Sequence, residues 1–491
     1  MSPTPRARLL PLLLVPFAAA CATTHLTADW WADSAHHMAA ADHAAASQAG
    51  AEILAAGGNA VDAAVAVGFA LAVVRPQSCG LGGGGFMVIH RPGESPVVVD
   101  YREVAPAGAA LAAYLDAEGK PIPGRTRYGG WAVGVPGEVK GLLYALQTFG
   151  SGRISRADVL GPAIRLAHRP LVVDAHLCDA MRSFARNVES HPAFARRFAA
   201  LREHVLRNGR PYAIGDAIDR SEIAAVLNEI AERGAAGFYS GWVAQRIAQT
   251  VREVGGPLST ADLAAYVPRV ITPLRGRFGP FEIITMPPPS SGGAVLLQVL
   301  NVLSGSDSEL PDWNPARPAD AHRIVEALKH AFADRARYLG DRSRDVMSDA
   351  ARMITPRRAA QVRAAIDAEK TLPVDAYGIQ ATPDDSGTCH YCVVDADGMA
   401  VAATDTINTE FGSYLYVPGT GIILNNELDD FTVDSATPNA YGLRQSRRNL
   451  IRPGRRPLSS MSPTIVVRDG RVELVVGASG GPRIITATLQ V

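Results

Sequence analysis

A segment composed almost entirely of apolar residues, Ala60–Val74, constrains the fold of this chain most strongly. Asn59 directly before it is a favoured helix N-cap residue, and Asp62 in the first turn suits the positive end of a helix dipole. The segment carries an aspartate and is too short to span a bilayer, so it predicts a helix inside a protein core. A glycine-rich loop at residues 80–85 and a strand-like segment, Phe86–His90, follow it.

The rest of the chain combines helices with short strands. Asp320–Tyr338 has the periodicity of an amphipathic helix, whereas the sequence from Thr388 onward consists of short β runs separated by Gly and Asp-Gly turns. There is no internal repeat and no regular alternation of strand and helix. The pattern predicts an α+β fold in which helices flank a mostly antiparallel sheet.

The composition is that of a globular protein and excludes several classes. Of the 491 residues, 47% are hydrophobic and 20% are charged, which excludes a disordered or fibrous chain. The 48 basic residues balance the 48 acidic ones, so the basic face that nucleic-acid binding requires is not expected. Five cysteines are too few for a disulfide framework in a chain of this length.

The first residues resemble a secretory signal rather than part of the fold. Arg6 and Arg8 precede an apolar stretch, Leu9–Ala20, that is too short for a membrane span. We therefore expect residues 1–20 to be a signal peptide and the protein to be secreted across the inner membrane. Because Cys21 follows small residues, two endings stay open: ordinary cleavage, or lipidation of Cys21 with anchoring at the cell envelope.

Two motif-like patterns are interpreted as structural. Gly80, Gly82 and Gly85 have the spacing of a dinucleotide-binding fingerprint, but here a helix precedes and a strand follows, the reverse of that motif. We expect instead a loop whose backbone packs closely. His322 and His330 lie about 12 Å apart on one helix at 1.5 Å per residue, too far to share an ion, so no metal site is expected.

Two further motifs lie near the C-terminal end. Cys389 and Cys392 resemble a redox pair, but residues three apart on a strand face opposite sides of a sheet. Gly477-Ala478-Ser479-Gly480-Gly481 matches a nucleophile elbow between the strand-like Val472–Val476 and the helix-like Arg483–Gln490. No Asp, Glu or His follows it, so a catalytic triad is excluded. What remains is a strand-to-helix turn whose backbone N–H groups can bind an oxyanion.

The strands that follow Thr388 bring two hydroxyl groups together. The strand-like segments 389–395 and 399–404 flank the loop Ala396-Asp397-Gly398, which is typical of a three-residue hairpin. Closing this loop pairs residue i with residue 794 − i, and directly opposed residues share a face of the sheet. Thr388 then lies opposite Thr406. From the residues alone, a catalytic pair and an ordinary pair of β-forming threonines both stay open.

Several ordered blocks of sequence carry a resemblance to a known family. Gly387-Thr388-Cys389-His390-Tyr391 resembles the self-cleavage site of the γ-glutamyltranspeptidases, which belong to the N-terminal-nucleophile hydrolases. The blocks that extend the resemblance over nearly all of the chain after the signal are Gly57-Gly58-Asn59-Ala60-Val61-Asp62-Ala63-Ala64, Gly82-Gly83-Gly84-Gly85-Phe86-Met87, Arg102-Glu103-Val104-Ala105-Pro106, Val135-Pro136-Gly137, Pro287–Gly293, Asn425–Phe431, Arg456–Thr464 and Gly480-Gly481.

The resemblance implies a four-layer αββα fold and a precursor that cleaves itself between Gly387 and Thr388. Cleavage would free the α-amine of Thr388, with a pKa of about 7.7–8.0, so that one residue carries both nucleophile and base. Its hydroxyl would attack a γ-glutamyl amide, and water or an amine would resolve the resulting ester. Thr406 matches the position that hydrogen-bonds Thr388, and Gly480 and Gly481 match the oxyanion hole.

The resemblance also implies how the zwitterionic end of the substrate is bound. Arg102 would hold the α-carboxylate as a bidentate fork, with Ser459 and Ser460 as neutral donors. Tyr441 resembles the lid over the site. The residues that match the acceptors of the α-amino group are Asn408, Glu427 and Asp430. An acyl group without a carboxylate would leave Arg102 unpaired, which argues against a related amide acylase.

The implied organisation is a large-subunit part, residues 21–387, and a small-subunit part, residues 388–491, that together form one αββα domain. Glutathione and other γ-glutamyl compounds are the implied substrates, amino acids or dipeptides the acceptors, and no cofactor is expected. The sequence ends at Val491, inside the helix-like run, where the family's small subunit continues. We therefore expect a C-terminally truncated sheet stack, and a non-catalytic fragment or pseudo-enzyme stays open as the alternative to an active enzyme.

Overall fold

The computed structural model describes residues 32–304, 313–314, 316–373, 377 and 387–491. The chain divides into two compact units, Met1–Ala35 and His36–Val491, and all helices and strands of the described residues belong to the second. The signal-peptide prediction for residues 1–20 and the lipidation prediction for Cys21 lie outside the described residues. Within the described ranges, no helix has both the length and the apolar content needed to cross a bilayer.

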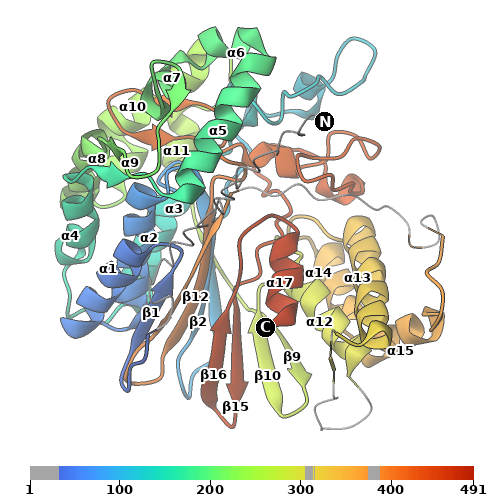
Figure 1. The fold of residues 1–491 in the computed structure, drawn as a ribbon. Helices are drawn as coiled ribbons and strands as arrows, with labels where there is room; N and C mark the ends of the chain where they lie inside the picture. Colours follow the sequence, from blue (N-terminus) through green and yellow to red (C-terminus); the bar gives the residue numbers. More distant parts are fainter. Residues whose placement is uncertain (1–31, 305–312, 315, 374–376, 378–386) are drawn as a thin grey trace, which may run out of the picture. The chain divides into compact units, whose positions relative to one another are not determined.

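Two antiparallel sheets form the middle of the second unit (Figure 1). The first sheet has the order β1-β11-β12-β2-β3-β8, with bounds Met38–Ala41, Cys389–Val394, Ala400–Thr406, Gly84–His90, Val97–Asp100 and Arg269–Ile271. The second has the order β16-β15-β10-β9, with bounds Arg471–Val476, Thr464–Arg468, Phe281–Thr285 and Leu274–Phe278. Apolar side chains of both sheets, among them Phe86, Ala402 and Ile465, form one buried cluster between them.

One helical layer covers the outer face of the first sheet. Its central helix is α2 (Ala60–Val74), which packs on β11 and β12 and is buried along its whole length. The Asn59 side chain and Asp62 form a capping box, so the predicted start of this helix is confirmed. The other helices that precede β8 are α1 (Ala44–Ala55), α3 (Glu138–Phe149), α4 (Arg156–Ala167), α5 (Ala175–Ser190), α6 (Pro192–Arg197), α7 (Ala199–Val205), α8 (Ser221–Arg233), α9 (Ala236–Tyr239), α10 (Gly241–Glu253) and α11 (Thr260–Ala265).

A second helical layer covers the outer face of the second sheet. Helix α12 (Gly292–Leu303) packs on β9 and β10, and α17 (Arg483–Gln490) packs beside it. The remaining helices of this layer are α13 (Pro318–Tyr338), α14 (Arg344–Met353) and α15 (Pro356–Ala365). The order of layers is helix, sheet, sheet, helix, so the predicted αββα fold is confirmed (Figure 1).

The hairpin β11–β12 has the predicted register. Cys389 pairs with Asp405 and Val394 with Ala400, so opposed residue numbers sum to 794 as the loop geometry requires. The glycine loop before β2 packs closely, as predicted: a Cβ atom on Gly83 would lie 2.0 Å from the Thr406 carbonyl oxygen. This loop therefore holds the end of β12 in place. Short two-stranded pairings link β4 (Leu171–Val172) to β7 (Ala217–Ile218), β5 (Leu206–Arg207) to β6 (Arg210–Pro211), and β13 (Tyr416–Val417) to β14 (Ile422–Ile423).

Candidate active site

The two threonines predicted to oppose each other are in hydrogen-bonding contact. The Oγ1 atoms of Thr388 and Thr406 lie 2.9 Å apart, and both side chains are buried. The Thr388 N–H donates to the Ser78 carbonyl at 3.1 Å, which fixes the start of β11. Thr388 has a φ of 89°, a left-handed conformation that β-branched residues rarely adopt. Backbone strain is therefore located at the residue that follows the predicted cleavage site.

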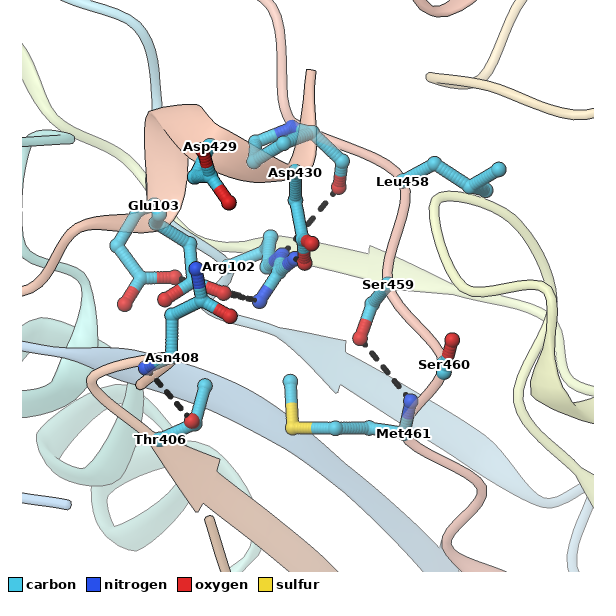
Figure 2. Close-up of polar contacts among 12 residues, drawn as sticks. Arg102, Glu103, Thr406, Asn408, Asp429, Asp430, Leu458, Ser459, Ser460 and Met461 are labelled. Carbon is cyan, nitrogen blue, oxygen red and sulfur yellow. Dashed lines mark hydrogen bonds and ion pairs between the residues drawn. The ribbon is translucent and has the colours of Figure 1, made fainter. Parts of the chain in front are cut away.

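The residue before Thr388 has to be glycine. Gly387 has a φ of 69°, and a Cβ atom there would lie 2.2 Å from the Asn408 carbonyl oxygen. Asn408 in turn donates its N–H to Thr406 Oγ1 at 2.8 Å (Figure 2). The bond between residues 387 and 388 is thus held against the turn that follows β12.

The predicted oxyanion residues form the turn before α17. Gly480 and Gly481 are buried, have φ values of 102° and 56°, and their N–H groups donate no hydrogen bond within the described residues. A Cβ atom on Gly481 would lie 2.6 Å from the ring of Tyr441, and the Tyr441 hydroxyl donates to the Asn408 carbonyl at 2.8 Å. A continuous series of contacts therefore joins this turn to the threonine pair. Tyr441, the predicted lid residue, is buried within that series.

Arg102 lies at the centre of a buried cluster of charges (Figure 2). Its guanidinium forms an ion pair with Glu427 and a second one with Asp430 at 2.6 Å, while its Nε donates to the Pro457 carbonyl at 3.3 Å. Burial lowers the pKa of Arg102, but the carboxylates of Glu427, Asp430 and Glu103 outweigh burial and raise it. The predicted donor to the α-carboxylate thus contacts two predicted acceptors of the α-amino group.

This pairing corrects one argument made from the sequence. The sequence resemblance implies that an acyl group lacking a carboxylate leaves Arg102 unpaired, which counts against an amide acylase. Glu427 and Asp430 are carboxylates of the protein itself and both pair with Arg102, so an acyl group lacking a carboxylate would not leave Arg102 unpaired and that argument is wrong. The guanidinium of Arg102 and the carboxylates of Glu427 and Asp430 instead neutralise each other. The α-carboxylate and α-ammonium groups of a zwitterion can replace both partners of these ion pairs at once.

The two predicted serine donors lie on the segment before β15. The Ser459 carbonyl accepts hydrogen bonds from the N–H and hydroxyl of Ser291, and its own Oγ accepts from the Met461 N–H at 3.0 Å (Figure 2). Within the part of the chain that the structure describes, neither Ser459 Oγ nor Ser460 Oγ donates a hydrogen bond, so both hydroxyl hydrogens can be offered to a ligand. Ser460 Oγ accepts from Arg335 Nη2 at 3.4 Å. The structure therefore adds a second guanidinium to the surroundings of the predicted carboxylate donors.

Arg335 was not singled out from the sequence, which identified α13 only as amphipathic. It is 1% exposed, its Nε donates to Ser291 Oγ at 2.8 Å, and its Nη1 has no partner within the described residues. Burial lowers the pKa of Arg335 to about 10 although Asp430 acts in the opposite direction. The only sequence signal for a role of Arg335 was its position on the face of α13 that also carries the small apolar residues Ala327 and Ala331.

A group of buried acids lies on the face of β12 that the helices cover. Asp405, next to Thr406, accepts a hydrogen bond from the Tyr101 hydroxyl, and Glu138 of α3 lies close by. Burial raises the pKa of Asp405 to about 6, and burial followed by repulsion from Asp405 raises the pKa of Glu138 well above its ordinary value. The folded protein therefore holds protons on carboxyl groups that the unfolded chain releases near pH 4.

Replacing Glu138 with glutamine should make the stability of the protein less sensitive to a rise in pH from 5 to 8. The stabilisation from these protonated acids is complete below pH 4 and is lost as the pH rises through about 6 and beyond. Glutamine cannot ionise, so the melting temperature of Glu138→Gln relative to the wild type should rise by about 2 °C or more between pH 5 and pH 8. Thermal scans at several pH values measure this difference. Glu94→Gln, at an exposed position, is the matched control, and parallel curves for all three proteins would refute the assignment.

Comparisons with known proteins agree with this architecture. A sequence model described as gamma-glutamyltranspeptidase matches residues 46–491. The glutathione hydrolase proenzyme of Pseudomonas sp. (strain A14) is 40% identical over 445 residues, which cover 90% of this chain and 76% of that protein. The proenzyme of Escherichia coli (strain K12) is 40% identical over 457 residues, 92% of this chain and 77% of that protein.

Solved structures show the same fold. A cephalosporin acylase from Bacillus halodurans superposes with a TM-score of 0.76 at 26% identity, covering 93% of this chain and 79% of that one. The gamma-glutamyltranspeptidase of Helicobacter pylori superposes with a TM-score of 0.65 at 32% identity, covering 71% of this chain and 97% of that one. The extent of the sequence match, together with the αββα layers, shows that this chain belongs to the gamma-glutamyltranspeptidase family.

Proposed function

We propose that this protein is a γ-glutamyl transferase/hydrolase that cleaves itself and then uses Thr388 as its nucleophile on glutathione and related γ-glutamyl compounds. Membership of the family and the glutathione hydrolase proenzymes that are 40% identical to this chain support the activity. The observation that carries the role of Thr388 is the 2.9 Å contact between its hydroxyl and that of Thr406, directly after a glycine that no other residue can replace.

In the proposed maturation step, Thr388 Oγ1 attacks the carbonyl carbon of Gly387. The bond from that carbon to the Thr388 nitrogen breaks, the acyl group moves to the oxygen as an ester, and the nitrogen becomes an amine. Water then hydrolyses the ester and releases the Gly387 carboxylate. The strained φ of Thr388 and the hydrogen bond to Thr406 both support attack at this bond.

In the proposed catalytic cycle, the freed α-amine accepts the proton of the Thr388 hydroxyl as that oxygen attacks the γ-carbonyl of the substrate. The N–H groups of Gly480 and Gly481, which have no partner within the described residues, can donate to the oxyanion that develops. The amine of the leaving group departs with the proton. Water or the amino group of an amino acid or dipeptide then resolves the γ-glutamyl ester.

The proposed binding mode places the substrate zwitterion inside the charge cluster. Its α-carboxylate replaces the carboxylates now paired with Arg102 and accepts hydrogen bonds from Ser459 and Ser460. Its α-ammonium then donates to Glu427 and Asp430, which lose their contact with the guanidinium. Asn408 contributes its side-chain carbonyl. Arg335, which contacts Ser460 and has an unpartnered Nη1, adds positive charge on the carboxylate side.

We propose the following cellular arrangement from the sequence pattern. Residues 1–20 direct secretion across the inner membrane, and the mature protein is periplasmic or lipid-anchored through Cys21. Self-cleavage divides the remainder into residues 21–387 and 388–491. These two parts stay together because β11 and β12 of the second part lie between β1 and β2 of the first part in one sheet.

A panel of three amide substrates tests the proposed function against that of a related acylase. The panel contains a chromogenic γ-glutamyl anilide, its α-carboxamide derivative, and the glutaryl anilide that lacks the α-amino group. Each derivative carries only one of the two charges that together replace the ion pairs of Arg102 with Glu427 and Asp430. Its binding would therefore break those ion pairs and replace only one partner, so kcat/KM should fall on the order of 10³-fold for either one. Equal or faster turnover of the glutaryl compound would identify an acylase, a result compatible with the structural similarity to the cephalosporin acylase. No turnover of any amide by the cleaved protein would favour a pseudo-enzyme.

A further inference from the structure

We propose that Cys79 and Cys389 form a disulfide bond that joins the two chains produced by self-cleavage. Their Sγ atoms lie 3.1 Å apart, and the two side chains are 2% and 0% exposed. Cys79 belongs to the part before the cleavage site, whereas Cys389 directly follows Thr388. The bond itself depends only on this pair of thiols, but its role as a link between chains rests on the proposed cleavage.

The backbone around both cysteines is held in place. The Ser78 carbonyl accepts the N–H groups of Thr388 at 3.1 Å and of Ile407 at 3.2 Å, so residues 78 and 79 lie beside the start of the hairpin. On the other side of Cys79, the glycine loop packs closely on β12. A disulfide requires its sulfurs at about 2.0 Å, so the two Sγ atoms, now 3.1 Å apart, need to approach by about 1 Å.

The surroundings favour a structural disulfide over other uses of two thiols. Cys389 Sγ also lies 3.5 Å from Asp42 Oδ2, but that carboxylate pairs with Arg75, and no group of three metal-binding side chains occurs within the described residues. Burial raises the pKa of both thiols, which disfavours the thiolate needed for exchange. A disulfide at this position, once formed, would therefore exchange slowly.

The neighbouring cysteine of the apparent redox motif takes no part. Cys392 faces the second sheet, where its Sγ contacts His390 Nε2 at 3.1 Å and the Val475 carbonyl at 3.2 Å. Cys389 instead belongs to the core on the side of the helices, where Cys79 also lies. The alternation of side chains on a strand thus separates Cys389 from Cys392 and leaves Cys79 as its partner.

The chemistry requires an oxidant and an oxidising compartment. Each thiol loses one hydrogen atom as the S–S bond forms, and a disulfide oxidant, either a thiol–disulfide oxidoreductase or a small-molecule disulfide, is reduced to two thiols. The proposed secretion would bring the chain into such a compartment. Because both sulfurs are buried in the folded protein, we expect oxidation during folding. The bond would then fix the nucleophile's strand covalently to the residues before the cleavage site.

Mass spectrometry of the full chain tests this proposal without any variant. Protein folded in the presence of glutathione disulfide is denatured without reductant and alkylated, then reduced and labelled with a second reagent before digestion. Cys79 and Cys389 should carry only the second label, whereas Cys178 and Cys392 should carry the first. On a denaturing gel without reductant the two chains should migrate together, and with reductant they should separate.

Variants separate this proposal from the proposed self-cleavage. Cys79→Ser and Cys389→Ser should each release residues 388–491 on the gel without reductant. Cys178→Ser should not, because Cys178 is a buried cysteine whose sulfur has a backbone carbonyl as its only hydrogen-bond partner within the described residues. Thr388→Ala should remain uncut and still protect Cys79 and Cys389 from the first label. If the wild-type chain stays uncut while Cys79 and Cys389 are protected from the first label, the proposed self-cleavage is refuted and the disulfide is not. First-label modification of both cysteines in oxidised wild-type protein would refute the disulfide, whether or not the chain is cut.

Discussion

Replacing Thr388 with alanine should leave the chain uncut and reduce γ-glutamyl turnover on the order of 10⁴-fold or more. Alanine removes the hydroxyl that lies 2.9 Å from Thr406 Oγ1, and with it the proposed nucleophile of both maturation and catalysis. The loss should therefore appear in two independent measurements. Intact mass spectrometry with N-terminal sequencing reports the cleavage, and hydrolysis of a γ-glutamyl anilide reports the turnover.

Thr388→Ser is the matched control for this substitution. Serine keeps the hydroxyl and the α-amine, so this variant should still cleave itself and turn over substrate, at reduced rates. Lower rates are expected because serine lacks the γ-methyl group that restricts rotation of the buried Thr388 side chain. If Thr388→Ala were cut at the same bond as the wild type, the assignment of Thr388 as the nucleophile of self-cleavage would fail.

Replacing Arg102 with glutamine should raise the KM for γ-glutamyl substrates about 10²-fold or more and also destabilise the fold. Glutamine cannot supply the charged fork for the α-carboxylate. It also leaves the carboxylates of Glu427 and Asp430 without their buried partner, which costs about 3–5 kcal/mol. Steady-state kinetics and thermal unfolding measure the two effects, and the KM for the α-carboxamide substrate should change much less than that for the free acid.

A double variant separates binding from stability. Arg102→Gln with Glu427→Gln removes one of the orphaned carboxylates, so it should regain part of the lost melting temperature without restoring the KM. Arg456→Gln is the matched control, because Arg456 is equally buried but pairs with Asp100. It should lower stability with no selective effect on the α-carboxylate. Recovery of the KM in the double variant would show that Arg102 acts through folding and not through the substrate.

Local sequence predicted the elements whose geometry depends on neighbouring residues. The predicted helix Ala60–Val74 has those bounds in the structure because Asn59 and Asp62 form its capping box. The register of the hairpin after Thr388 follows from a three-residue loop, which leaves little freedom to the strands it joins. Helix α1 (Ala44–Ala55) has a weaker local start signal, because its N-cap is His43, an uncommon residue at that position.

The resemblance supplied the αββα class, whereas the order of the strands that produces the site came from the structure. β11 and β12 insert between β1 and β2, which places Thr388 beside the Ser78 carbonyl and the glycine loop. Strand pairing between segments some three hundred residues apart depends on the packing of the whole sheet. No local pattern along the chain specifies that neighbour.

The sequence by itself determined the family, the candidate nucleophile and its opposing hydroxyl, because those depend on short motifs and one hairpin. Only the tertiary structure decided the partners of the buried charges and thiols. Arg102 pairs with Glu427 across 325 positions of the chain, and Cys79 meets Cys389 across 310. Such contacts arise where packed layers exclude water and each polar group takes the partner that folding brings within reach.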